Sequence, residues 1–116
     1  MIENLQIYHV NVNCTDFERS LAFYKMIGFK EHINFEEGGV DGLGFEHCRI
    51  KARLLSLGDD PRATVIDLIE WKEPKTAGAP YPHLAHTGIA RICFRLKNLD
   101  SAYEELLEKG AEFLSP

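Results

Sequence analysis

The stretch Ile7–Phe29, "IYHVNVNCTDFERSLAFYKMIGF", decides the fold of this 116-residue chain. Its first half alternates between apolar and polar side chains. The apolar positions are Tyr8, Val10 and Val12, and the polar positions are His9, Asn11 and Asn13. Alternation with a period of two is typical of a half-buried strand, which we predict over residues 5–13.

The second half of the stretch has the spacing of a helix. Thr15 and Glu18 match a capping box, which predicts a helix that begins at about Asp16. Apolar side chains then recur at intervals of four and three residues, as expected for a helix with one buried face. Gly28 is a natural C-terminal cap, because glycine readily adopts the left-handed conformation found there.

The next segments read as three further strands. We place them at residues 29–36, 44–58 and 63–72, with a glycine-rich loop at 38–44 and a turn at 59–62. Together with the first strand and the helix, they predict one βαβββ module over residues 5–72. The proline-rich residues 73–87 that follow have no periodicity and are interpreted as a linker.

A second stretch, "GIARICFRLKNLDSAYEELLEKGAEF" from Gly88 to Phe113, repeats the pattern of the first. A single offset aligns His9 with Arg91 and Gly28 with Gly110, and it preserves the strand alternation and both helix ends. The repeat predicts a strand at about residues 90–96, a helix that runs from about residue 99 to Gly110, and a short strand at 111–115. One shift of the first stretch along the sequence aligns all these features with the second stretch, which favours a duplicated module.

We therefore expect an α+β fold of paired βαβββ modules in a single domain over residues 1–116. The first module covers 5–72, the linker 73–87, and the start of an incomplete second module 88–116. The last two strands of the second module are missing from the sequence. We expect either that the sequence is cut short relative to its parent protein or that those strands were never observed.

Composition excludes several classes of partner. The formal net charge of −5 argues against nucleic acid, whose phosphates require a basic surface. No apolar run approaches the roughly 20 residues that span a membrane, and the N-terminus has no basic and apolar leader. Three cysteines without a CxxC pair favour a reducing compartment. These features predict a cytoplasmic protein.

One family shows this combination of motifs. The matching positions are His9, Asp16, Ser20, Phe23, Tyr24, Gly28 and Phe29, followed by the triplet Ile66–Asp67–Leu68 in the fourth strand. The pattern resembles the vicinal oxygen chelate superfamily, which includes glyoxalase I, fosfomycin and bleomycin resistance proteins, methylmalonyl-CoA epimerase and extradiol dioxygenases. The resemblance implies that paired modules curl around a divalent metal ion. The two strands missing from the second module would leave an unpaired sheet edge, which predicts a homodimer because such edges recruit another chain.

The resemblance also implies a set of site residues. His9 and Asp67 take the first two metal-ligand positions, for Zn, Ni, Mn or Fe, and the fourth position lies beyond Pro116. The chemistry of the two side chains supports these roles in part, because imidazole and carboxylate are suitable ligands for such ions. The alternative for His9 is a hydrogen-bonded residue without metal, and Glu70 is the second choice for the carboxylate.

Arg91 occupies the third ligand position, where a guanidinium cannot bind a metal because it has no lone pair to offer. It can instead bind a carboxylate or enolate oxygen of a substrate, or form a salt bridge with Asp67 that fills the metal site. A solvated edge residue is the remaining alternative. With Asn11 and Cys93, which share the inward strand faces, Arg91 completes the predicted substrate-binding set.

Two further groups allow more than one interpretation. His83 and His86 lie three residues apart, a spacing that could suit a metal pair, but their proline-rich segment favours surface residues, such as those of a flap. Arg49, Lys51 and Arg53 share one strand face, where they could steer an anionic substrate or form a solvated stripe.

The predicted function is an enzyme that acts on a small oxygenated metabolite by lyase, isomerase or dioxygenase chemistry. A metal at His9 and Asp67, or Arg91 in its place, would stabilise an oxyanion. The alternative is a non-catalytic, bleomycin-resistance-like protein that sequesters a small ligand.

Overall fold

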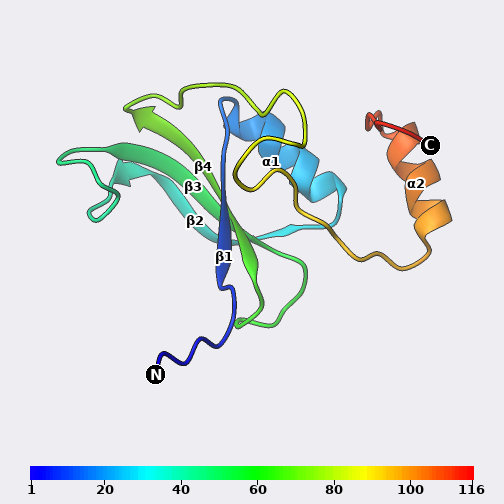
Figure 1. Ribbon diagram of the computed structural model, residues 1–116, viewed down its shortest axis with the longest axis horizontal. Coiled ribbons are helices and arrows are strands. Elements are labelled where there is room, and N and C mark those ends of the chain that lie inside the picture. The colour runs from blue at the N-terminus through cyan, green and yellow to red at the C-terminus, as the bar shows by residue number, and fades with distance from the viewer. The chain divides into compact units, whose positions relative to one another are not determined.

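The computed structural model describes residues 1–116, which form two compact units, Met1–Ala77 and Gly78–Pro116. The first unit contains β1 (His9–Asn13), α1 (Phe17–Met26), β2 (Lys30–Gly39), β3 (Arg49–Ser56) and β4 (Val65–Glu73), and the second contains α2 (Leu99–Glu108) (Figure 1). A mixed four-stranded sheet with two helices confirms the predicted α+β class, and the first unit has the predicted βαβββ order.

The four strands form one sheet in the order β1-β4-β3-β2. β1 runs parallel to β4, whereas β3 pairs antiparallel with both β4 and β2. The predicted start of the first strand at residue 5 was too early. Before His9 the chain makes isolated hydrogen bonds rather than a ladder. Gln6 Nε2 donates to the carbonyl of Arg62 (2.7 Å), Thr64 Oγ1 donates to that of Ile7 (2.5 Å), and the Val65 amide donates to that of Tyr8 (3.0 Å).

The helix α1 begins at Phe17 and is capped by Asp16, whose carboxylate accepts a hydrogen bond from the Arg19 amide at 3.2 Å. The predicted capping box at Thr15 was therefore one residue early. At the other end Gly28 has a φ of 105°, a conformation that favours glycine, which confirms its predicted role after the helix.

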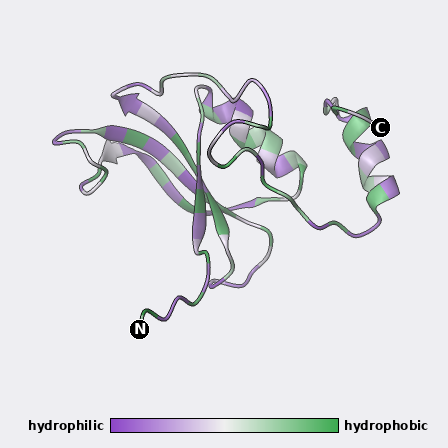
Figure 2. Cartoon of the chain, in the orientation of Figure 1, coloured by the Kyte–Doolittle hydropathy of each residue, from purple (hydrophilic) through white to green (hydrophobic).

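The main core lies between α1 and one face of the sheet, here called the helix face. Its buried apolar side chains are Phe17, Leu21, Leu55, Ile66 and Leu68. The opposite face, here called the inner face, carries His9, Asn11 and Asn13 from β1, Asp67, Ile69 and Trp71 from β4, Ala52 and Leu54 from β3, and Ile33 and Phe35 from β2. Hydrophilic and hydrophobic bands alternate along the strands in Figure 2, as expected when neighbouring residues face opposite sides.

The second unit departs from the sequence prediction. Residues 89–97 form no strand, and neither do residues 111–115. The predicted alternation nevertheless persists in the burial, because Ala90, Ile92 and Phe94 are half-buried while the residues between them are exposed. A strand requires a neighbour to pair its backbone amides and carbonyls, and the second unit contains no other strand. The predicted helix is confirmed as α2.

Neither helix has the length and apolar character required to cross a membrane.

Candidate functional site

The inner face brings together two of the predicted site residues, His9 and Asp67. Parallel pairing of β1 with β4 aligns His9 with Val65 and Asn11 with Asp67, so that the imidazole and the carboxylate share one face. His9 Nδ1 lies 3.8 Å from Asp67 Oδ2. The His9 side chain is 48% exposed and that of Asp67 only 16%, so the pair is accessible from the histidine side.

Burial raises the pKa of the Asp67 carboxyl above its ordinary value, and nearby His9 offsets part of this effect. The ionised carboxylate has lost much of its hydration in the folded state, and the neighbouring His9 offsets this loss only in part. The ionised Asp67 side chain therefore lowers the stability of the folded protein. Destabilising residues of this kind are common at sites that bind a ligand.

We expect Asp67→Asn to raise the melting temperature by a few degrees at pH 7. A carboxyl whose folded-state pKa is raised destabilises the protein increasingly as pH rises from the unfolded value of about 4 through the folded value. The gain from asparagine should therefore disappear at pH values below about 4, where both states of the parent are protonated. Thermal unfolding at the two pH values measures this, and a lower melting temperature at pH 7 would contradict it.

Asn11 lies beside this pair and ties β1 to β4. Its amide nitrogen donates to the backbone carbonyl of Asp67 at 3.1 Å and to Asn13 Oδ1 at 3.3 Å. Both contacts lie within the protein, so they orient the side chain on the inner face. Its role in binding substrate stays a prediction.

Two residues of this face were missed as functional candidates, namely Asn13 and Trp71. The indole nitrogen of Trp71 donates to Asn13 Oδ1 at 3.0 Å, and the ring of Phe45 meets the indole edge-on, with centroids 5.5 Å apart. The alternation of side chains along the strand could have identified Trp71. It lies four residues from Asp67, an even number, and so shares its face of the sheet. These residues give the inner face an aromatic end next to its polar strand.

Apolar side chains line the rest of the inner face. Ile50, Ala52 and Ile69 are buried together, with Val40 and Trp71 packed against them. Ile33 and Phe35 of β2 are 51% and 38% exposed, so apolar surface remains open to solvent on the side away from β1. The face therefore combines a polar strand with an apolar wall, which is the usual composition of a small-molecule site.

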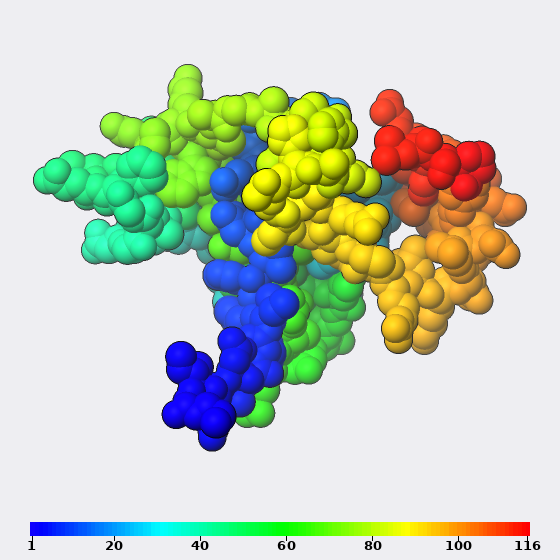
Figure 3. Space-filling view, in the orientation of Figure 1, coloured from blue at the N-terminus to red at the C-terminus, as the bar shows by residue number.

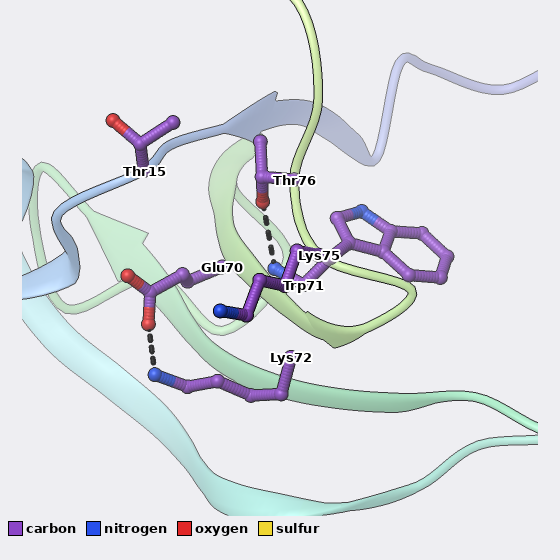
Figure 4. A pocket seen from close by; sticks show the side chains of 6 residues that line it. All are labelled: Thr15, Glu70, Trp71, Lys72, Lys75 and Thr76. Carbon is purple, nitrogen blue, oxygen red and sulfur yellow. Dashed lines mark hydrogen bonds and ion pairs between the residues drawn. The ribbon is translucent and has the colours of Figure 1, made fainter.

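Glu70, the second choice for the carboxylate ligand, lies on the other face of the sheet. It pairs with Lys72 and borders a shallow cavity of about 350 Å³ (Figure 4). The lining residues are Thr15, Glu70, Trp71, Lys72, Lys75 and Thr76. This cavity contains neither His9 nor Asp67, and strand parity prevents Glu70 from joining them.

Arg91 and Cys93 belong to the second unit, where both are exposed. Cys93 is a free thiol. The predicted contribution of these two residues to the substrate site stays a prediction.

The chemistry of the His9–Asp67 pair suits a divalent metal ion. Two tetrahedral ligands about 2.1 Å from a zinc ion lie about 3.4 Å apart, so the observed 3.8 Å would need to shorten only slightly. No cluster of three or more His, Cys, Asp or Glu side chains able to hold a metal occurs in the chain. The pair would therefore supply two ligands. Water, substrate or other protein groups would fill the remaining coordination positions of the metal.

Comparison with known proteins agrees with this fold. The sequence profile of the Glyoxalase/Bleomycin resistance protein/Dioxygenase superfamily matches residues 8–116. The crystal structure of a glyoxalase family protein from Bacillus cereus superposes with a TM-score of 0.78 at 16% identity, covering 99% of this chain and 78% of that one. No curated protein matches the sequence. The profile spans nearly the whole chain, and the chain therefore belongs to the glyoxalase/bleomycin resistance protein/dioxygenase superfamily.

Proposed function

We propose that this protein is a metal-dependent enzyme that acts on a small oxygenated metabolite by lyase, isomerase or dioxygenase chemistry. The observation that carries the proposal is the His9–Asp67 pair, 3.8 Å apart on the inner face. A bound divalent cation would polarise an oxygen of the substrate and stabilise negative charge that develops there. His9 would bind the cation through an imidazole nitrogen, and Asp67 would neutralise part of its charge.

The surroundings of the pair support this role. Asn11 fixes β1 against β4 and so holds His9 and Asp67 at a constant separation. The carboxylate of Asp67 is largely shielded from water, which strengthens its attraction for a cation. The apolar wall next to the pair would cover the carbon skeleton of the substrate and exclude water from it.

One observation favours a second function, the sequestration of an aromatic ligand without turnover. Trp71 and Phe45 meet edge-on at one end of the inner face, where a further aromatic ring could stack. Turnover of a substrate would separate the enzyme from this alternative.

We also propose that the protein is a cytoplasmic homodimer. The outer edge of β1 pairs with no strand, and such edges favour association with another chain. All three cysteines are free thiols, which agrees with a reducing compartment.

We expect His9→Ala and Asp67→Ala each to lower the affinity for Zn²⁺ or Mn²⁺ at this site by roughly tenfold or more, since each removes a ligand. Both side chains lie on the inner face, away from the main core, so the fold should persist. Titration calorimetry of untagged protein measures the affinity, and circular dichroism checks the fold.

His47→Ala and Asp59→Ala are the matched controls, because both residues are exposed and lie in loops of the same unit. Their affinities should equal that of the parent. If the two inner-face variants bind the metal as tightly as the controls do, the metal assignment is wrong.

A further inference from the structure

A short loop in the second unit, Tyr81–Gly88, is folded tightly on itself. The ring of Tyr81 stacks on that of His86, with centroids 5.7 Å apart and planes 13° from parallel. The ring of His86 in turn meets that of His83 at 4.7 Å. The loop thus places two imidazoles side by side, although it forms neither helix nor strand.

Local sequence explains why the loop holds this shape. Pro82 restricts both its own φ and the conformation of Tyr81 before it. Gly88 has a φ of 116°, and a Cβ atom at that position would lie only 2.4 Å from the Tyr81 hydroxyl. The His86 amide also closes the turn by donating to the His83 carbonyl at 3.5 Å. The two rings are therefore positioned before any ligand arrives.

The separation of the two rings matches that of two imidazoles on one metal ion. An imidazole nitrogen lies about 2.1 Å from such a metal, which places each ring centroid about 3.2 Å away. Two centroids 4.7 Å apart then correspond to an angle of about 95° at the metal, close to the angle between adjacent octahedral ligands. The pair can approach this geometry with little rearrangement.

The state of His83 also suits a ligand. Its Nδ1 accepts a hydrogen bond from the Ala85 amide at 3.2 Å, so this nitrogen carries a lone pair. A cation would take that lone pair, and the Ala85 amide, on an exposed residue, would pair with water instead. Every residue from Tyr81 to Gly88 is exposed, and the yellow stretch that contains the loop is open to the viewer in Figure 3.

We propose that His83 and His86 form a two-imidazole binding site for a divalent transition-metal ion such as Cu²⁺, Ni²⁺ or Zn²⁺. Water completes the coordination, because no third His, Cys, Asp or Glu joins the pair. Imidazole ligands favour these ions, with Cu²⁺ bound most tightly. The site is distinct from the inner-face pair of the proposed function, because it uses neither His9 nor Asp67.

The test is calorimetric titration of the untagged full chain with NiCl₂. His83→Ala and His86→Ala should each weaken one binding event by roughly tenfold or more, whereas His47→Ala, which removes an exposed loop histidine of the first unit, should leave it unchanged. His9→Ala should also leave this event unchanged, which separates the site from that of the proposed function. Parent-like Ni²⁺ binding by both loop variants would overturn the proposal.

A second measurement identifies the ligands directly. Substoichiometric Ni²⁺ should broaden the NMR signals of the His83 and His86 rings before those of His32 and His47, which belong to neither proposed site. Gly88→Ala keeps both imidazoles but forces the Tyr81 ring to move, so it should weaken binding by a few-fold. Broadening of His32 or His47 before the two loop histidines, or unchanged affinity in Gly88→Ala, would show that the loop is not a preformed site.

Discussion

Leu68→Ala should lower the free energy of unfolding by about 3 kcal/mol, the largest effect that we expect from a single substitution. Leu68 is 0% exposed and lies on β4, which has neighbours on both sides. The flanking strands restrict collapse around the missing side chain, so the variant would lose both the transfer free energy and the contacts around a cavity. Urea unfolding followed by circular dichroism measures the change.

Leu57→Ala is the matched control, because Leu57 is 58% exposed in the loop after β3. Its free energy of unfolding should stay within about 0.5 kcal/mol of the parent value. A cost below about 1 kcal/mol for Leu68→Ala would mean that the space between α1 and the sheet is less tightly packed than the structure indicates.

Arg53→Ala should cost about 2 kcal/mol, the second-largest effect. The guanidinium is nearly buried on the helix face, where Nε lies 2.9 Å from Glu31 Oε1 and Nη2 lies 2.7 Å from Glu36 Oε1. It also stacks at 5.2 Å over the ring of Phe17. Alanine would remove both ion pairs and the packing of the aliphatic stem on the ring.

The cost of Arg53→Ala should depend on pH. Lys25 and then Arg53 lower the pKa of Glu31 in the folded protein. A depressed folded-state pKa adds stability that is present above the unfolded value of about 4.3 and is lost as pH falls through the folded value. The difference between parent and variant should therefore shrink in acid, which urea unfolding at pH 7 and pH 3 would show.

Arg49→Ala is the control for this prediction, because Arg49 lies on the same strand and pairs with Glu37, but both side chains are nearly half exposed. Its cost should stay below about 1 kcal/mol. Equal costs for the two variants would show that the burial of Arg53 adds nothing to its ion pairs.

Burial of Arg53 also corrects an interpretation of the sequence. Arg49, Lys51 and Arg53 were candidates for steering an anionic substrate or for a solvated stripe. Arg53 and Lys51 face α1, each cation of the stripe has a glutamate partner, and Asp67 lies on the opposite side of the sheet. Both interpretations were therefore wrong for Arg53, which joins the sheet to its helix.

Local patterns in the sequence determined several features of this protein. Alternation along residues 9–13 and 65–73 placed His9 and Asp67 on the faces where they are found, and Gly28 marked the end of α1. These features depend on residues within a few positions of one another, so the sequence alone carries them. The family motifs are also patterns of residues that lie close together in the sequence, and they identified the superfamily.

Only the tertiary structure decided which distant residues meet. The parallel pairing of β1 with β4 brings His9 to Asp67, and the partners of Arg53 come from a neighbouring strand. The alternating residues 90–96 form no strand, because alternation describes which side chains are buried but does not supply a neighbour for the backbone. Pairing depends on contacts between segments far apart in the chain, which periodicity within one segment does not encode.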